Sequence, residues 1–125
     1  MSRVLIVEDD QSLGKMYERI FGLNGDKVEL INNGQIALSR LKDYKNKPDI
    51  VILDVIIPGM SGLDVLRNIK EDNNVSDIPV VVLTNSFNKD NEELMTSLGA
   101  DLYLIKIDND AKEVVEKVNK LLNKK

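Results

Sequence analysis

The chain has 125 residues, of which 42% are hydrophobic and 30% charged, a composition typical of one folded domain rather than of a disordered chain. It contains no cysteine and no histidine, which excludes disulfides, Cys/His zinc sites and every catalytic arrangement that needs a thiolate or an imidazole. Its net charge of −4 disfavours nonspecific attraction to nucleic acid or to an anionic membrane surface.

The first half of the chain begins with a continuous apolar run at residues 4–7, which is typical of a strand buried in a parallel sheet. Residues 12–23 carry apolar side chains at helical spacing, and residues 27–31 form a second, weaker strand. The Asn33–Gly34 turn then leads into a helix that we expect to end before Lys47–Pro48.

The second half continues the alternation of strand and helix. Residues 50–53 and 80–83 are apolar, β-branched runs, and Ser61 is a candidate N-cap for the helix between them. The remaining elements are a helix over 89–98 ending at Gly99, a strand over 102–105, and a helix over 111–123 capped within Asp108–Asn109–Asp110.

This alternation predicts the fold class. Five βα units without a linker or an internal repeat indicate one α/β domain, in which helices cover both faces of a parallel five-stranded sheet. Right-handed crossovers favour a flavodoxin-like doubly wound (βα)5 sandwich with strand order 2-1-3-4-5. In that order the carboxyl ends of strands 1 and 3 meet at the switch point of the sheet, where ligands bind.

Polar side chains follow the strands at this edge. Acidic residues 8–10 follow the first strand, Asp54 follows the third, Thr84 the fourth and Lys106 the fifth. Clustered carboxylates raise one another's pKa unless a cation neutralises them, and an oxygen-only ligand set favours Mg²⁺ or a similar hard ion. A carboxylate beside such a cation, opposite an ammonium and a hydroxyl, is suited to nucleophilic attack on phosphorus.

Four segments carry more specific motifs. They are Val-Leu-Ile-Val-Glu-Asp-Asp at 4–10, Ile-Leu-Asp-Val-Ile-Ile-Pro-Gly-Met-Ser-Gly-Leu-Asp at 52–64, Val-Val-Val-Leu-Thr at 80–84 and Gly-Ala-Asp-Leu-Tyr-Leu-Ile-Lys at 99–106. Together they closely resemble the receiver domain of two-component response regulators, and the second motif is highly specific. The resemblance runs from Val4 to about Leu122, so that residues 1–125 are expected to form a single receiver domain.

The resemblance implies a phosphoacceptor and a metal site. Asp54 is the expected acceptor of the phosphoryl group and a ligand of Mg²⁺. Asp9 is expected to bind the ion directly and Glu8 through water, while the backbone carbonyl of Ile56 completes the protein ligands. Asp10 lies one position beyond the acidic pair and is assigned to helix capping or to support of the ligands.

The resemblance also implies contacts to the phosphoryl group and a switch residue. Thr84 and Lys106 would contact the phosphoryl oxygens. Tyr103 matches the aromatic residue that changes position on activation, although a half-buried aromatic on an outer strand needs no such role.

Three positions depart from the usual pattern of the family. Proline generally follows the lysine, but here it is Ile107; because a cis bond to a non-proline residue costs about 2.5–4 kcal/mol, we predict a trans Lys106–Ile107 bond and an altered loop. Asn85 replaces a small residue after Thr84 and would crowd the pocket or bond to its rim. Ile56 places an apolar side chain two residues after the acceptor, and our hypothesis is that it screens attacking water.

The implied partners are those of a phosphorelay. A histidine kinase or a histidine phosphotransfer protein would donate the phosphoryl group, and a downstream protein or a second copy of the receiver would read the face of the fourth helix, fifth strand and fifth helix. No direct contact with nucleic acid or a membrane is expected. Because an acidic residue already stands at position 8, a signal peptide is not expected, and we place the chain in the cytoplasm. The end of the chain after the last helix fits a stand-alone regulator or an excised receiver.

Other classes fit less well. A flavin-binding flavodoxin needs a phosphate loop rich in Gly, Ser or Thr, where this chain has acidic residues 8–10. Phosphatases with an aspartate nucleophile carry Asp-x-Asp after the first strand, which is absent here. The serious alternative is a degenerate receiver that acts as a phosphorylation-independent interaction module, as Asn85 and Ile107 suggest. The expected function is nevertheless that of a phosphoacceptor regulator with intrinsic phosphotransfer and autodephosphorylation activity, not an enzyme that turns over an external metabolite.

Overall fold

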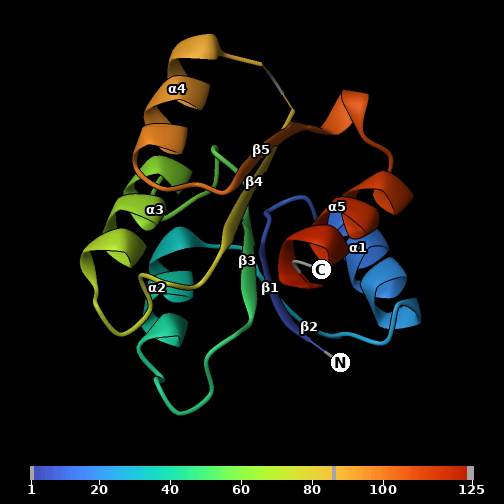
Figure 1. Ribbon diagram of the computed structural model, residues 1–125, viewed down its shortest axis with the longest axis horizontal. Coiled ribbons are helices and arrows are strands. Elements are labelled where there is room, and N and C mark those ends of the chain that lie inside the picture. Colours follow the sequence, from blue (N-terminus) through green and yellow to red (C-terminus); the bar gives the residue numbers. More distant parts are fainter. Residues whose placement is uncertain (1, 86, 124–125) are drawn as a thin grey trace.

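The computed structural model describes residues 2–85 and 87–123, which fold into a five-stranded parallel sheet with helices on both faces (Figure 1). The strand order is β2-β1-β3-β4-β5, which confirms the order expected from the sequence. In chain order the elements are β1 (Arg3–Val7), α1 (Gln11–Leu23), β2 (Lys27–Ile31), α2 (Gly34–Leu41), β3 (Ile50–Leu53), α3 (Gly62–Glu71), β4 (Val80–Thr84), α4 (Lys89–Ser97), β5 (Leu102–Ile105), the 3₁₀ turn η1 (Lys106–Asp108) and α5 (Ala111–Asn123).

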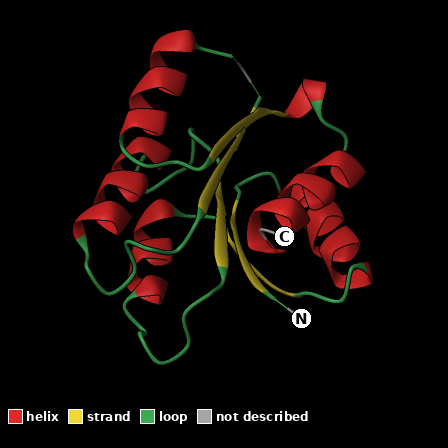
Figure 2. Ribbon diagram, in the orientation of Figure 1, coloured by secondary structure: helices red, strands yellow, loops and turns green. Residues whose placement is uncertain are grey.

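The sheet separates two hydrophobic layers. Helices α2, α3 and α4 cover one face, and α1 and α5 cover the other (Figures 1 and 2). Because side chains alternate along a strand, Leu5 and Val7 of β1 pack toward α2–α4, whereas Val4 and Ile6 pack toward α1 and α5. Strands buried on both faces are continuous in apolar residues, which explains why the runs in β1, β3 and β4 were visible in the sequence.

Each helix begins at a polar side chain whose oxygen accepts an N–H of the first turn, which satisfies part of the helix end. Asp110 and Glu113 form a reciprocal pair, because the Glu113 N–H donates to Asp110 Oδ1 (2.8 Å) and the Asp110 N–H donates to Glu113 Oε1 (3.1 Å). Ser61 caps α3, as predicted, and Asp110 is the residue within 108–110 that caps α5. The capping residues in chain order are Asp10, Asn33, Ser61, Asn88 and Asp110.

Two local features differ in extent from the sequence pattern. Helix α2 ends at Leu41, before the Lys47–Pro48 boundary, and the Arg40 guanidinium donates to the Asn46 carbonyl (2.7 Å), which holds the intervening segment as a loop. The 3₁₀ turn η1 directly follows β5 and carries Lys106 at its start. In the described part of the chain, no helix is both long enough and apolar enough to cross a membrane.

Candidate functional site

The register of the central strands brings two acidic residues together. Val7 of β1 pairs with Leu53 of β3, so that the next residues, Glu8 and Asp54, leave the sheet side by side. The Asp54 N–H donates to the Val7 carbonyl (3.2 Å), which continues the ladder up to the acidic side chain. Both acids are buried, each with 7% of its surface exposed. The parallel topology therefore places carboxylates from residues far apart in the sequence in one recess.

Lys106 lies between these two carboxylates. Its Nζ donates to Glu8 Oε1 at 2.7 Å and to Asp54 Oδ2 at 2.9 Å. The second oxygen of each acid accepts a backbone N–H, since Asp10 donates to Glu8 Oε2 (3.1 Å) and Ile56 donates to Asp54 Oδ1 (3.4 Å). The Lys106 side chain is only 8% exposed, so that these are ion pairs removed from bulk water. Charge-assisted bonds of this kind fix both carboxylates in orientation.

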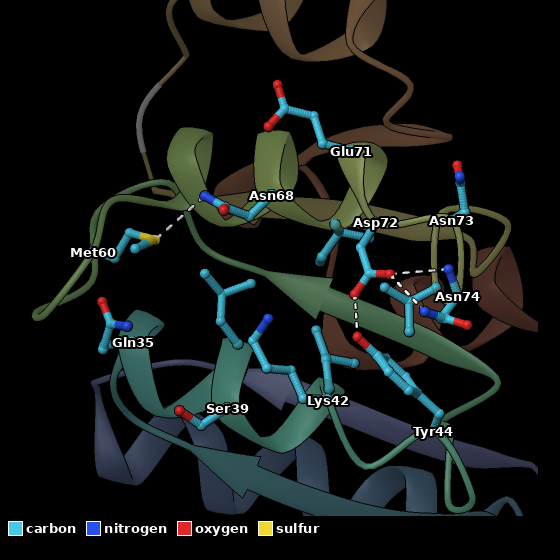
Figure 3. A pocket seen from close by; sticks show the side chains of 14 residues that line it. Gln35, Ser39, Lys42, Tyr44, Met60, Asn68, Glu71, Asp72, Asn73 and Asn74 are labelled. Atoms are coloured by element: carbon cyan, nitrogen blue, oxygen red, sulfur yellow. Dashed lines mark hydrogen bonds between the residues drawn. The ribbon is translucent and has the colours of Figure 1, made fainter.

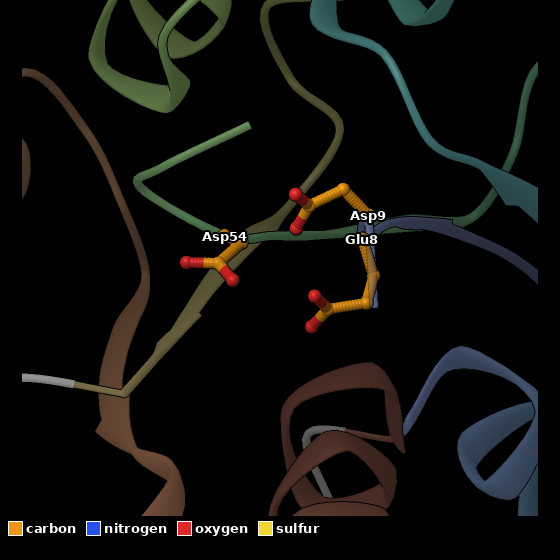
Figure 4. A group of neighbouring side chains, drawn as sticks. All are labelled: Glu8, Asp9 and Asp54. Atoms are coloured by element: carbon orange, nitrogen blue, oxygen red, sulfur yellow. The ribbon is translucent and has the colours of Figure 1, made fainter. Parts of the chain in front are cut away.

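A third carboxylate completes an acidic cluster. Figure 4 shows Glu8, Asp9 and Asp54 gathered where β1 and β3 end, with the exposed Asp9 beside the two buried acids. One oxygen from each lies within 4.8 Å of the others. When all three are ionised, the ammonium of Lys106 balances one of the charges and leaves an excess of two. An all-oxygen donor set with that excess fits a hard divalent cation such as Mg²⁺.

The ion pairs and burial act on the pKa values in opposite directions. Burial raises the pKa of Glu8 above its ordinary value, although the hydrogen bond and the positive charge of Lys106 oppose it. For Lys106, burial is the largest single effect and would lower the pKa, but the hydrogen bonds to Glu8 and Asp54 and the negative charges of these two acids together outweigh burial and raise the pKa. The lysine therefore remains an ammonium across the neutral range.

The other expected residues lie on the two outer strands at the same edge. Thr84 ends β4, is 3% exposed, and pairs in register with Ile105, the residue before Lys106. Tyr103 packs against the hydrophobic layer under α2–α4, and its buried hydroxyl has no hydrogen-bond partner among the described residues. Burial raises the pKa of Tyr103, and the negative charges of Glu92 and Asp54 add to this effect. Both residues thus lie on strands that lead to the acidic recess.

The residues that depart from the family pattern are exposed around this edge. Ile56 and Ile107 are 75% and 88% exposed, and Asn85 is also exposed. The Lys106–Ile107 peptide bond is trans, as predicted, and the chain after β5 forms the 3₁₀ turn η1. The expected effects of Asn85 on the pocket and of Ile56 on attacking water remain predictions.

Glycines hold the loop that follows Asp54. The Gly62 N–H donates to the Val55 carbonyl (2.8 Å), and the Gly34 N–H donates to the Pro58 carbonyl (2.9 Å). A Cβ on Gly62 would lie 2.1 Å from the Asp54 carbonyl oxygen, and one on Gly34 would lie 2.2 Å from the Met60 carbonyl oxygen. The backbones of α2, α3 and the loop therefore approach too closely for any side chain.

Two polar residues near the site have structural roles, one of them expected from the sequence and the other not. Asp10 caps α1 by accepting the Leu13 N–H (3.1 Å), in agreement with its assignment to capping. Asn109, which the sequence placed only within a capping run, is 6% exposed and donates its side-chain amide to the Ile105 carbonyl (3.1 Å). The run 108–110 contains more polar residues than a single helix cap requires. This excess is the one sequence signal that could have drawn attention to Asn109.

A separate groove of about 610 Å³ lies between α2 and α3 (Figure 3). None of the expected site residues lines it. At one end the Tyr44 hydroxyl donates to Asp72 (2.8 Å), and Asp72 accepts the Asn74 N–H (3.0 Å). The hydrogen bond from Tyr44 lowers the pKa of Asp72. These contacts tie together the loops that follow α2 and α3, on elements distinct from the acidic recess.

Known proteins are similar to this chain in sequence and in fold. Residues 4–119 match the response regulator receiver domain. The DNA-binding response regulator MtrA of Mycobacterium tuberculosis is 36% identical over 104 residues, which cover 83% of this chain and 43% of MtrA. The transcriptional regulatory protein CpxR homolog of Haemophilus influenzae is 35% identical over 125 residues, which cover 99% of this chain and 52% of that protein. The chain thus spans about half the length of these relatives.

A solved structure also resembles this chain in fold. The BeF3-activated N-terminal receiver domain of RstA from Klebsiella pneumoniae superposes with a TM-score of 0.85 at 25% identity, over 96% of this chain and 97% of that one. The match with the receiver family covers residues 4–119, and the superposition on RstA shows the same overall fold. The chain belongs to the receiver domain family of two-component response regulators.

Proposed function

We propose that this chain is the phosphoacceptor switch of a two-component phosphorelay and that Asp54 carries the phosphoryl group. The observation that carries this proposal is the Lys106 ammonium held between the Glu8 and Asp54 carboxylates, with Asp9 completing a cluster within 4.8 Å. Four separate strand ends supply an acidic recess, a nucleophilic carboxylate, an ammonium and a hydroxyl. This arrangement suits phosphoryl transfer, which depends on positioning and charge stabilisation.

In the proposed reaction a carboxylate oxygen of Asp54 attacks the phosphorus of a phosphohistidine. The new P–O bond forms as the P–N bond breaks, and the imidazole nitrogen leaves with the bonding electron pair and takes up a proton. Lys106 then exchanges a hydrogen bond to the free Asp54 carboxylate for one to a phosphoryl oxygen, and the Thr84 hydroxyl donates to another. Attack of water on the phosphorus later breaks the P–O bond to Asp54, which releases inorganic phosphate, restores the carboxylate and resets the switch.

We assign the Mg²⁺ site to the same recess. Asp9 and Asp54 would bind the ion directly, Glu8 through water, and Ile56 through its backbone carbonyl. The two charges that Lys106 leaves unbalanced support a divalent ion. When bound, Mg²⁺ neutralises charge on the phosphoryl oxygens.

The proposed output is a shift between two arrangements of the face made by α4, β5 and α5. Bonds from Thr84 and Lys106 to the phosphoryl group would draw in the loops after β4 and β5, which biases an existing equilibrium. The pairing of Thr84 with Ile105 supports joint movement of these loops. Tyr103, whose hydroxyl is buried without a partner among the described residues, is the proposed aromatic switch.

The whole of residues 1–125 forms one receiver domain in this proposal, and its cytoplasmic location is part of it. The phosphodonor is a histidine kinase or a histidine phosphotransfer protein. The reader of the switched face is a downstream protein or a second copy of the receiver. The BeF3-activated receiver of RstA supports the phosphorylation chemistry, because beryllium fluoride resembles a phosphoryl group in shape and charge.

The test is phosphorylation in solution. The protein is incubated with Mg²⁺ and acetyl phosphate, and intact-mass spectrometry is expected to show one added phosphoryl group. Asp54→Asn is expected to abolish the gain, because the amide cannot act as the nucleophile. Asp64→Asn is the matched control, since Asp64 is an exposed acid on α3 whose side chain pairs only with Arg67 among the described residues, and it is expected to leave the gain intact.

An unmodified wild-type protein, tested with acetyl phosphate, phosphoramidate and a phosphorylated histidine phosphotransfer domain, would overturn the proposal. That result would favour the phosphorylation-independent interaction module instead. Retention of the mass gain in Asp54→Asn would move the acceptor to another residue.

A further inference from the structure

The loop after β5 must place Lys106 without a proline. Proline restricts its own φ angle, whereas Ile107 leaves the backbone after Lys106 free to rotate. The Ile107 side chain is 88% exposed, so that packing does not fix the turn either. The turn η1 is only three residues long, and one turn of 3₁₀ helix is weak by itself. Another contact is therefore needed to set the backbone from which the Lys106 side chain projects.

Asn109 supplies contacts on both sides of Lys106. Its backbone N–H donates to the Lys106 carbonyl (3.3 Å), and its side-chain amide donates to the Ile105 carbonyl (3.1 Å). The carbonyl groups of the two peptide units that flank Lys106 are thus both bound to one residue. Asn109 is itself 6% exposed, and polar groups so deeply buried are held in place by their hydrogen bonds.

Lys117 of α5 fixes the orientation of this amide. Its Nζ donates to Asn109 Oδ1. A lysine ammonium can only donate and the Ile105 carbonyl can only accept, so that the amide oxygen must face Lys117 and the amide nitrogen must face Ile105. The contacts form a chain from α5 through Asn109 to the end of β5.

We infer that Asn109 is a positioning residue that holds the backbone of Lys106 so that the ammonium reaches Asp54 and Glu8. The inference rests on the proposed function and deepens it, because it names the group that aims the phosphoryl-binding lysine where the chain lacks proline. Asn109 contacts neither carboxylate and acts only through the Lys106 backbone. Loss of its amide would let the loop move and carry Lys106 Nζ away from the acceptor.

The test compares phosphorylation rates with Mg²⁺ affinity. Asn109→Ala removes the amide, and Asn109→Asp keeps the size and the acceptor for Lys117 but loses the donor to Ile105. Both are expected to lower the acetyl phosphate rate constant by roughly ten- to hundred-fold, as displacement of a catalytic group by about 1 Å does. Mg²⁺ affinity, measured by calorimetry, is expected to stay at or above the wild-type value because its ligands are untouched.

Asn119→Ala is the matched control. Asn119 lies further along α5 and exchanges two amide hydrogen bonds with Asn24 at the end of α1, at 3.0 and 3.2 Å. Its removal is expected to leave the phosphorylation rate constant unchanged. Wild-type rates in both Asn109 variants would overturn the inference. Equal losses of rate and Mg²⁺ affinity would also overturn it, because they indicate a general structural role.

A second measurement separates this inference from the proposed function. In the phosphate-free protein, the Lys106 ammonium is bound to two carboxylates and its protons are expected to exchange slowly enough for an NMR signal. Lys106→Met assigns that signal. The signal is expected to vanish in Asn109→Asp and to persist in Asn119→Ala. A persistent signal in Asn109→Asp refutes the positioning role, whereas absence of phosphorylation in the wild-type protein refutes only the proposed function.

Discussion

At the scale of single residues, the recess combines burial with charge. Glu8 and Asp54 each use one oxygen for Lys106 and the other for a backbone N–H, while Asp9 remains exposed. Pairing of a buried carboxylate offsets only part of its loss of hydration. Glu8 shows the balance directly, because burial raises its pKa in spite of the ion pair.

This balance predicts how stability depends on pH. The Glu8 carboxyl takes up a proton at a higher pH in the folded protein than in the unfolded chain, whose value is near 4.5. Between these two pKa values, the folded protein binds more protons at Glu8 than the unfolded chain does. The stabilisation contributed by Glu8 is therefore complete below pH 4.5 and is lost as pH rises through the pKa of the folded state. Relative to Glu8→Gln, the free energy of unfolding should therefore rise as pH falls from about 7 toward 4.5.

The measurement is urea unfolding of both proteins in EDTA, because metal would change the titration. The quantity compared is the wild-type free energy of unfolding minus that of Glu8→Gln at each pH. A difference that stays constant or falls on acidification would show that the ion pair with Lys106, rather than burial, dominates at Glu8.

The sequence was sufficient to anticipate the residues of the recess but not all that support them. Glu8, Asp54, Thr84 and Lys106 directly follow or end apolar runs, and strand ends in a parallel sheet share one edge. Asn109 had no such signal, since it lies in the turn between β5 and α5, and the fold of that turn sets its bonds to Ile105, Lys106 and Lys117. Hydrogen bonds that depend on the conformation of a loop leave no periodic trace in the sequence.

At the scale of elements, close backbone approach positions the loop between β3 and α3. Gly62 opens α3 against the backbone of Asp54 and Val55, and Asn33 at the start of α2 lies against the same loop at Gly59. The boundaries of most elements followed from apolar periodicity and caps. The end of α2 and the turn η1 could not be predicted in this way. The contact of Arg40 with Asn46 determines the first, and the hydrogen bonds around Lys106 determine the second.

Two glycine substitutions should have opposite effects. In Gly62→Ala the Cβ would lie 2.1 Å from the Asp54 carbonyl oxygen and 2.8 Å from the Val55 Cα, so that backbone must move. We expect a loss of about 1–3 kcal/mol, as for overpacking, together with slower phosphorylation. In Gly22→Ala of α1, where no atom lies within 4 Å of the Cβ, we expect a gain of about 0.5–1 kcal/mol.

Thermal and urea unfolding of the two variants measure these changes, and acetyl phosphate labelling measures the effect on the site. Gly22→Ala serves as the control for replacing glycine with alanine in a helix. Equal free energies of unfolding for the two variants would contradict this prediction. That result would mean that the loop after Asp54 moves to accept a Cβ on Gly62 without loss of stability.

At the scale of the whole molecule, the proposed Mg²⁺ site should couple ion binding to stability. The unfolded chain cannot hold Glu8, Asp9 and Asp54 within 4.8 Å, so that Mg²⁺ should bind the folded state selectively. At a free concentration of about 100 times the dissociation constant, selective binding adds about 2.7 kcal/mol and raises the melting temperature.

Calorimetric unfolding across a Mg²⁺ titration, followed by EDTA, measures this shift. Asp9→Asn removes an exposed carboxylate of the cluster without disturbing the buried pairs, and it should reduce the shift at a given Mg²⁺ concentration. A melting temperature that is the same in Mg²⁺ and EDTA would contradict the assignment of the site.

The recess is also assembled from remote parts of the chain. Lys106 is separated by 98 residues from Glu8 and by 52 from Asp54, and β4 lies between the strands that end at Asp54 and Lys106. A nascent or truncated chain that ends before Lys106 has Asp54 but lacks the ammonium that pairs with it. Under the proposed function, unfinished copies should therefore not be phosphorylated efficiently, and signalling would require the completed domain.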